Sequence, residues 1–290
     1  MTAPAASRNH LPATARLGPV TLQVADLGRS AAFYEGLLGL EVQVEEAGTV
    51  SLSAADGASL ITLREHPGAR RVPQRERLEL FHLALLLPDR ADLGSLLRHL
   101  GAAGVQIGMA DHLFSEALYL TDPDGLGVEL YADRPRETWR RGGGELVTDT
   151  LPLGVRGLLE AASNEPYRDM PAGTTVGHVH FHVSDLARAA SFYEQGLGFE
   201  PTITSFPGAR FVSAGGYHHH VGLNTWAAGA PLAAADDARL LEWRLELPSK
   251  AELNRVAERL RAAGYVVDVA TAEDVTAVDP WNIAVRISVA

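Results

Sequence analysis

The chain of 290 residues contains no cysteine, so it can form no disulfide, cysteine-ligated zinc site or iron–sulfur cluster, and it offers no thiol nucleophile. It also lacks any run of about 18 apolar residues that could cross a membrane. Basic residues are scarce, because 25 Lys and Arg stand against 36 Asp and Glu, which gives a formal net charge of −11. That balance argues against binding to nucleic acid or to an anionic lipid surface. Any metal must therefore be held by His, Asp or Glu.

Length and apolar content favour a globular protein of two domains. Apolar residues make up 46% of the chain, which is enough for sizeable cores, and a domain has about 150 residues on average. The first residues, MTAPAASRNHLPATAR, lack the apolar segment of a signal peptide. We therefore expect a flexible arm over residues 1–16 on a cytoplasmic protein.

The sequence repeats itself. VTLQVADLGRSAAFYEGLLGLE at residues 20–41 resembles VHFHVSDLARAASFYEQGLGFE at residues 179–200. FHLALLLPDRADLGSLLRHLGAAG, from Phe81, likewise resembles LEWRLELPSKAELNRVAERLRAAG, from Leu241. The two pairs are separated by almost the same distance along the chain, which indicates one duplicated block with two related halves. Four modules follow from this, at residues 17–66, 79–131, 176–226 and 238–289.

Each module has the pattern β-α-β-β-β. An alternating strand such as residues 179–183 opens it, an Asp caps the following helix, and a Gly ends that helix, as at Gly104 and Gly264. Short apolar segments with Gly, Pro and Asp turns complete the module, including the DPDG turn at residues 122–125. The sequence therefore predicts an α+β fold. Its parts are a first domain over 17–131, a linker over 132–175 with a segment that favours a short helix, and a second domain over 176–290.

The opening VSDLARAASFYEQGLGFE, the closing DPDGLGVELY and the HHH segment resemble the vicinal oxygen chelate superfamily. That superfamily includes glyoxalase I, bleomycin-resistance proteins and extradiol ring-cleaving dioxygenases. The resemblance covers the four modules and implies two cupped mixed sheets, with one divalent metal on the concave face of a module pair. Within the superfamily, GYHHHVGLNTW and SEALYLTDPDGLGVELYADRP are most similar to catechol 2,3-dioxygenase-type proteins.

In this superfamily the metal ligands come from the first and last strands of a module. At these places modules two and three have His82, Glu129 and His178. Two imidazoles and one carboxylate leave positions open on Fe(II) for a substrate and oxygen. The resemblance therefore implies an iron site, with Mn(II) or another divalent metal as the alternative. The matching places of modules one and four have Pro19, which cannot bind a metal, and Glu242 and Arg286, which would form a salt bridge instead.

Only one pairing of modules brings the three ligands together. Pairing modules one and two would place Pro19 beside His82 and Glu129, and pairing modules three and four would place the cation of Arg286 beside His178, where it would repel a metal. We therefore expect the metal between modules two and three. A second chain could supply the missing module, so a homo-oligomer with an intermolecular site stays open.

Extradiol enzymes carry a His-His pair in the segment that matches GYHHHVG, and the second His of the pair is the acid–base catalyst. Aligning that pair with this chain makes His219 the candidate. On a strand, His218 and His220 would share one face and His219 the other. A bulge would change the histidine that faces the site, so His218 and His220 stay open as catalyst or substrate contact, and so do a fourth metal ligand and simple packing.

Three further side chains complete the expected site. Tyr119 precedes Glu129 at a spacing that recurs in extradiol enzymes, where the Tyr hydroxyl contacts a substrate oxygen; a core Tyr is the alternative. His112 is similar to a site histidine of the family, or it fixes a loop. His180 shares a strand face with His178 and is expected to contact substrate, whereas His182 is expected to pack in the core.

The resemblance implies an extradiol dioxygenase that acts on a small aromatic diol with O2. In that mechanism His219 transfers protons and Tyr119 stabilises charge on a substrate oxygen. One alternative is a glyoxalase-like isomerase or lyase, which typically uses a second carboxylate on the last strand of the other module, where this chain is rich in His. Another alternative is a non-catalytic protein that sequesters a small molecule, although such relatives typically lack the complete ligand set.

Overall fold

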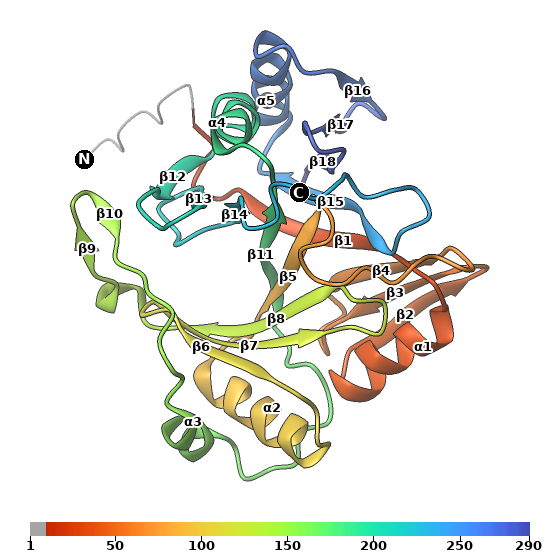
Figure 1. Ribbon diagram of the computed structural model, residues 1–290, viewed down its shortest axis with the longest axis vertical. Coiled ribbons are helices and arrows are strands. Elements are labelled where there is room, and N and C mark those ends of the chain that lie inside the picture. The colour runs from red at the N-terminus through yellow and green to blue at the C-terminus, as the bar shows by residue number, and fades with distance from the viewer. Residues whose placement is uncertain (1–9) are drawn as a thin grey trace.

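The computed structural model describes residues 10–290 and is built on two eight-stranded mixed sheets. Modules two and three form one of them, which we call the 2/3 sheet, and modules one and four form the 1/4 sheet. The sheets therefore do not coincide with the two halves of the chain, because each half contributes one module to each sheet (Figure 1). The fold is the α+β vicinal oxygen chelate arrangement that the sequence predicts.

The strands of the 2/3 sheet follow the order β12 (Glu200–Ile203), β13 (Ala209–Ser213), β14 (Val221–Asn224), β11 (Thr175–His182), β5 (Leu80–Leu86), β8 (Gly127–Asp133), β7 (Ser115–Thr121) and β6 (Gly108–Asp111). At its centre β11 and β5 pair in antiparallel orientation, and each has a parallel partner on its other side. This central pair is the seam between modules two and three.

The 1/4 sheet repeats this plan. Its order is β16 (Val267–Val269), β17 (Asp274–Val278), β18 (Ala284–Val289), β15 (Arg239–Leu247), β1 (Arg16–Val24), β4 (Ser59–Glu65), β3 (Thr49–Ser53) and β2 (Glu41–Glu46). Here β1 and β15 form the antiparallel seam. Each sheet thus combines the first module of one half of the chain with the second module of the other half.

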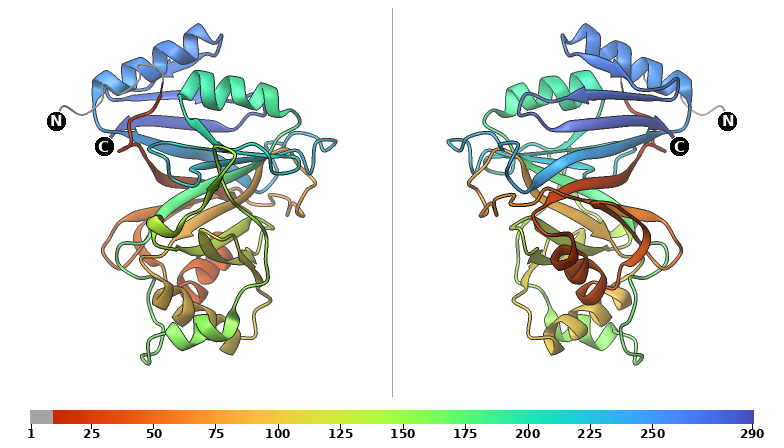
Figure 2. Two further views of the ribbon diagram at one scale, coloured as in Figure 1. Left: turned by 90° about the vertical axis from the view of Figure 1, so that its left-hand side faces the viewer. Right: turned by 90° about the vertical axis from the view of Figure 1, so that its right-hand side faces the viewer.

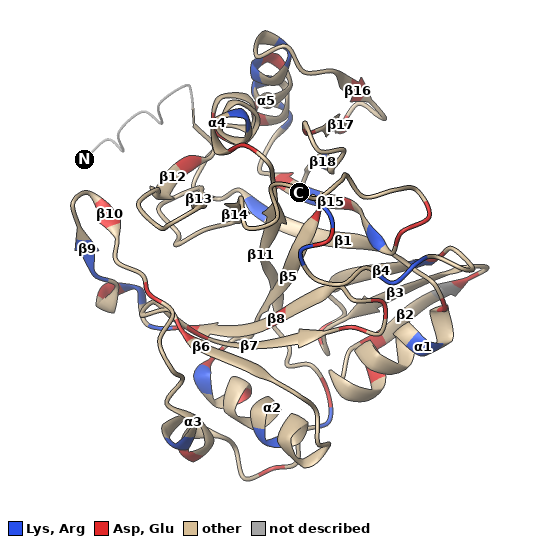
Figure 3. Cartoon of the chain, viewed as in Figure 1, with Lys and Arg blue, Asp and Glu red and all other residues tan. Residues whose placement is uncertain are grey.

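The helices lie at the two ends of the molecule, with the sheets between them (Figure 2). One end has α4 (Leu186–Ala190) and α5 (Lys250–Ala262), and the other has α1 (Leu27–Ala31), α2 (Arg90–Ala102) and α3 (Val155–Ala161). After α1 and α4 the chain continues in wider π-helical turns, η1 (Ala32–Leu37) and η3 (Ser191–Leu197). Charged residues mark the outer helices α2 and α5 (Figure 3). Among residues 10–290, no helix is long and apolar enough to span a membrane.

Side-chain caps start the module helices, as the sequence predicts. The carboxylate of Asp26 accepts a hydrogen bond from the N–H of Arg29, and Asp185 caps α4 in the same way. In α5 the residues Leu253, Val256 and Leu260 are buried against the sheet, whereas the intervening residues are mostly solvated. The module helices thus cover the outer face of the sheets and leave the opposite, concave face free for a site.

The prediction of a flexible arm over residues 1–16 is wrong from Leu11 onward. Leu11 is buried and its N–H donates to the carbonyl oxygen of Gly198, and β1 already begins at Arg16. Burial of the apolar side chains of Leu11 and Ala15 fixes this segment to module three. The rest of the predicted arm, residues 1–9, lies outside the described residues.

Matched hydrogen bonds connect the two sheets. The hydroxyl of Tyr34, in module one, donates to Asp122 in module two at 3.1 Å, and Tyr193 donates to Asp279 at 2.9 Å between modules three and four. Burial raises the pKa of each of these two carboxyl groups to about 6. Both carboxyl groups also accept backbone N–H groups of their own turns. The duplicated sequence therefore conserves a contact that crosses from one sheet to the other.

Glu79 generates a prediction about stability. Its carboxyl group is buried just before β5 and accepts the N–H of Leu240 in β15 at 2.6 Å, and burial raises its pKa to about 8. The native state therefore keeps a proton that the unfolded chain releases, so Glu79 makes the protein less stable as the pH rises from about 4.5 to 8. Glu79→Gln keeps an acceptor for Leu240 without the ionisation. We expect it to raise the free energy of unfolding at pH 8 and to flatten its pH dependence, by up to about 1.4 kcal/mol per pH unit.

Urea unfolding at several pH values measures this effect. Glu76→Gln, at an exposed position three residues earlier, is the control and should follow the unmodified protein. Parallel curves for Glu79→Gln and the unmodified protein would contradict the prediction.

Candidate metal site

Three buried side chains converge on the concave face of the 2/3 sheet. They are His82 on β5, Glu129 on β8 and His178 on β11. Oε2 of Glu129 lies 2.9 Å from Nε2 of His82 and 3.0 Å from Nε2 of His178, and the two imidazole nitrogens are 3.3 Å apart. The strand register produces this arrangement, because Ala84 of β5 is the partner of both His178 and Glu129.

The geometry and chemistry of these residues fit a divalent metal. Two ligand atoms at right angles, each about 2.1 Å from an ion, are about 3.0 Å apart. The three separations between the ligand atoms of His82, Glu129 and His178 are all close to that value. Two imidazoles and one carboxylate are also the donor set typical of non-haem Fe(II) centres with open positions.

Protonation in the site is suited to metal binding. Burial alone would raise the pKa of Glu129, but His178 and His82 lower it well below its usual range. Burial lowers the pKa of His178 to about 4, against the opposing effect of Glu129. An ionised carboxylate and a neutral imidazole are the forms that bind a metal, so both groups have the net charge that metal binding requires near neutral pH.

The corresponding position in the 1/4 sheet has no such donor set. Arg286 pairs with Arg244 across β18 and β15, as Glu129 pairs with Ala84 across β8 and β5, so Arg286 takes the place of Glu129. Its Nε donates to Glu242 at 2.9 Å. The salt bridge predicted from the sequence is therefore present.

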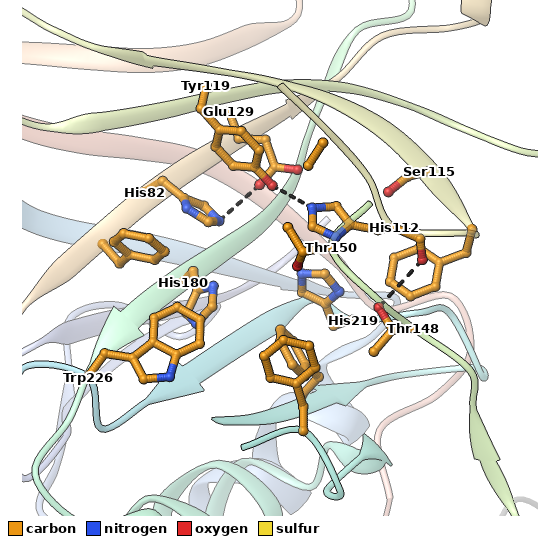
Figure 4. A pocket seen from close by; sticks show the side chains of 15 residues that line it. His82, His112, Ser115, Tyr119, Glu129, Thr148, Thr150, His180, His219 and Trp226 are labelled. Atoms are coloured by element: carbon orange, nitrogen blue, oxygen red, sulfur yellow. Dashed lines mark hydrogen bonds and ion pairs between the residues drawn. The ribbon is translucent and has the colours of Figure 1, made fainter. Parts of the chain in front are cut away.

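A cavity of about 250 Å³ opens beside His82 and Glu129 (Figure 4). Most of its wall is aromatic and apolar, and this part is made by Phe81, Phe114, Phe206, Phe211 and Trp226. Polar side chains also point into it, from His112, Tyr119, His180, His219, Thr148 and Thr150. A cavity that combines apolar walls with converging polar groups is typical of a site for a small molecule.

Tyr119 and His112 form a hydrogen-bonded pair at this cavity. Tyr119 lies directly opposite Glu129 across β7 and β8, and its hydroxyl is 2.7 Å from Nε2 of His112. Nδ1 of His112 is 2.9 Å from the carbonyl oxygen of Asp149, which can only accept, so Nδ1 has the proton. Nε2 of His112 then accepts from the hydroxyl of Tyr119. Burial, and then the carboxylate of Glu129, raise the pKa of Tyr119 well above its usual value, so this hydroxyl keeps its proton.

The three consecutive histidines are not on a strand, contrary to the prediction. They follow Gly215 and Gly216, whose φ angles of 62° and 66° turn the chain, and β14 begins only at Val221. Alternation of side chains therefore does not decide which histidine faces the cavity. His219 lines the cavity, and the ring of His218 is stacked on Phe114 behind it.

His220 points away from the cavity, so the structure does not place it where a substrate contact was expected. Its Nδ1 accepts the N–H of Ala214 at 3.1 Å, and its ring lies on Tyr217 at a separate groove that also contains Arg16. The turn of the backbone, which the strand prediction did not include, is the physical reason.

His180 does reach the cavity. Its Nε2 lies 2.9 Å from the side-chain nitrogen of Asn224. A Cβ at Gly222 would come within 2.7 Å of the His180 ring, so the neighbouring strand needs glycine at this place. His182 contacts the oxygen of the same Asn224 at 2.7 Å and does not line the cavity, which agrees with the packing role expected for it.

The linker contributes residues to the cavity that the sequence does not predict. Thr148 and Thr150 line the cavity, and the carbonyl oxygen of Asp149 between them holds His112. The linker also contains the hairpin of β9 (Arg141–Gly142) and β10 (Glu145–Leu146), and η2 (Arg136–Thr138). The aromatic wall was missed as well, although Trp226 stands in the GLNTW segment that carried the resemblance.

Comparison with known proteins agrees with this arrangement. The model of the Glyoxalase/Bleomycin resistance protein/Dioxygenase superfamily matches residues 16–130 and 175–277. The chain belongs to this superfamily. It is 43% identical over 256 residues to "Catechol-2,3-dioxygenase" of Bacillus subtilis (strain 168), which covers 87% of this chain and 90% of that protein.

Solved structures of low sequence identity share the fold of this superfamily member. A crystal structure from Bacillus subtilis subsp. subtilis str. 168 has a TM-score of 0.65 at 14% identity, covering 94% of this chain and 84% of the other. Glyoxalase I from Zea mays has a TM-score of 0.56 at 14% identity, covering 95% and 92%. These likenesses show the architecture alone.

The three converging ligands generate a prediction about metal content. Glu129→Ala and His178→Ala should each weaken the binding of Fe(II) by more than about a hundredfold, because loss of a ligand costs at least as much as loss of a group that orients one. Elemental analysis after anaerobic loading and desalting measures the metal per chain, and circular dichroism checks the fold. Glu242→Ala, at the matching place in the 1/4 sheet, should keep its metal. Full occupancy in both ligand variants would contradict the prediction.

Proposed function

We propose that this protein is a metal-dependent extradiol dioxygenase that opens the ring of a catechol-type diol with O2. The observation that supports this most strongly is the cluster of His82, His178 and Glu129. It lies beside a cavity whose wall includes His82 and Glu129 together with Tyr119 and His219. The name of the Bacillus subtilis relative supports the same activity. Both oxygen atoms of O2 enter the ring-opened semialdehyde, so the reaction needs no external reductant.

Fe(II) is the metal that we propose, with Mn(II) or another divalent ion as the alternative. When bound by His82, His178 and Glu129, it would supply open positions for the two vicinal oxygens of the diol and for O2. The protein holds these three side chains in place through strand pairing rather than through a loop, so the donor set is rigid.

The side chains around the cavity would transfer protons and orient the substrate. Burial, and then the neighbouring His178 and His218, lower the pKa of His219 well below its usual value, so it is neutral and able to accept a proton from a substrate hydroxyl. Tyr119 keeps its proton and can contact a substrate oxygen, while His112 fixes its orientation. The aromatic wall would enclose the ring of the diol and exclude water.

The composition of the cavity disfavours the other two functions. A glyoxalase-like isomerase or lyase would need a second carboxylate, but among the described residues that line the cavity only Glu129 has one. A protein that only sequesters a small molecule has no need of a complete ligand set with a proton acceptor beside it. Both alternatives would leave O2 unconsumed, so an oxygen electrode distinguishes them from the proposed activity.

The first functional prediction concerns His219. The protein loaded anaerobically with Fe(II) should consume one O2 per catechol and form a yellow semialdehyde product. His219→Ala should keep its metal and lose about a hundredfold or more in kcat, because it removes a proton-transfer group. His220→Asn is the matched control, since it alters the next residue of the same turn but keeps an acceptor for Ala214. Unchanged turnover in His219→Ala would contradict the role.

The second functional prediction concerns the substituent on the ring. The described residues that line the cavity include no Lys or Arg, so a carboxylate on the substrate would be buried without a partner. We expect kcat/KM to be at least about tenfold higher for 4-methylcatechol than for 3,4-dihydroxybenzoate, because an unpaired buried charge costs several kcal/mol. Equal kcat/KM values for the two diols would show that charge is tolerated.

A further inference from the structure

A chain of three polar side chains leads away from the cavity behind His219. Nδ1 of His219 lies 2.7 Å from Nδ1 of His218, and Nε2 of His218 lies 3.0 Å from Oδ1 of Asp133. Asp133 is the last residue of β8, the strand that also holds Glu129. The chain is therefore anchored to the same strand as the carboxylate of the candidate metal site.

Two aromatic rings pack closely on the ring of His218. Phe114 is stacked on one side, with ring centroids 4.5 Å apart and planes 13° apart, and the ring of Tyr217 lies 4.0 Å away. His218 has no exposed surface. It cannot turn without displacing these neighbours, so both of its nitrogens keep their partners.

The partners determine where the protons lie. A carboxylate only accepts, so Nε2 of His218 donates to Asp133. In neutral His218, Nδ1 is then bare and must accept, so Nδ1 of His219 has the proton that joins the two rings. Nε2 of neutral His219 is left with a lone pair. Among residues 10–290, the hydrogen bond of the His219 side chain is the one through Nδ1, and its ring forms part of the cavity wall.

We propose that Asp133 is a positioning residue that, through His218, keeps the proton of His219 on Nδ1 and presents the lone pair of Nε2 to the substrate. This inference rests on the proposed function, in which His219 accepts a proton from the diol. Without Asp133, Nε2 of His218 has no fixed acceptor, and the proton of His218 can move to Nδ1. His219 would then accept through Nδ1 and place a proton on Nε2, where it cannot act as a base.

His180 provides an internal reference in the same cavity. The N–H of Trp226 donates to the side-chain oxygen of Asn224 at 3.1 Å, which fixes the orientation of that amide. The amide nitrogen therefore donates to Nε2 of His180, and neutral His180 has its proton on Nδ1. Asp133 is not part of this network, so its removal should leave the proton of His180 in place.

The position of each proton can be measured directly. In the metal-free full-length protein labelled with ¹⁵N-histidine, two-bond ¹H–¹⁵N spectra distinguish a proton on Nδ1 from one on Nε2, and the His219→Asn variant assigns the His219 signals. We expect His219 to have its proton on Nδ1 in the unmodified protein. Asp133→Ala should shift it partly or wholly to Nε2, with His180 unchanged. Asp274→Ala, which removes a strand carboxylate of the 1/4 sheet, should change neither.

Kinetics provide the second measurement. Asp133→Ala, loaded with Fe(II), should keep its metal and the KM for catechol within about threefold, and should lose at least about tenfold in kcat because the base has the wrong tautomer. A loss of kcat with the proton of His219 still on Nδ1 would overturn the proposal, because the loss would then be structural.

The outcome for the unmodified protein is decisive by itself. A proton on Nε2 of His219 in that protein overturns the proposal, whether or not Asp133→Ala folds. If the loaded protein consumes no O2 with any catechol, the proposed function fails, and the spectra still show whether Asp133 controls the tautomer of His219.

Discussion

The antiparallel pairing of β5 with β11 is the constraint on which the candidate site depends. It sets His82 opposite His180 and His178 opposite Ala84, so imidazoles from two modules far apart in the sequence reach the same concave face. Side chains alternate along a strand, and a shift of one residue in this register would turn His178 to the helix-covered face. The parallel pairing of β5 with β8 then adds Glu129 from the same module as His82. Strand register alone thus brings the three candidate ligands together without a loop.

The two sheets differ in the residues at equivalent positions of the duplicated block. In the 2/3 sheet the equivalent positions bring together groups whose protonation suits an ion, whereas in the 1/4 sheet Arg286 neutralises Glu242. The latter pair is partly solvated, so its contribution to stability is small, about 0–1 kcal/mol. The concave face of that sheet therefore has polar residues at the equivalent positions but not the donor set of His82, Glu129 and His178.

Much of this architecture follows from the sequence, since duplication reveals four modules and the ligand types select the pairing that the sheets show. The convergence of His82, Glu129 and His178 could be predicted because each sits at a fixed place in a regular strand. The orientation of His218, His219 and His220 could not, because two glycines with positive φ replace the expected strand by a turn. Thr148, Thr150 and Asp133 were missed for a related reason, since irregular segments and strand ends have no periodicity that marks a side chain as facing a cavity.

Because each sheet combines modules from both halves, the chain is also equivalent to a dimer of two half-length chains that the linker joins. If two identical halves paired in this way, each sheet would combine the second module of one with the first module of the other, and both cups would be the same. Joining the halves in a single polypeptide removes that symmetry, because the residues on the concave face of each sheet are then encoded separately. One cup can lose its ligands without harm to the other, and the linker becomes free to supply residues such as Thr148 to one cup only. Fusion is thus what allows the two faces of this molecule to evolve separately.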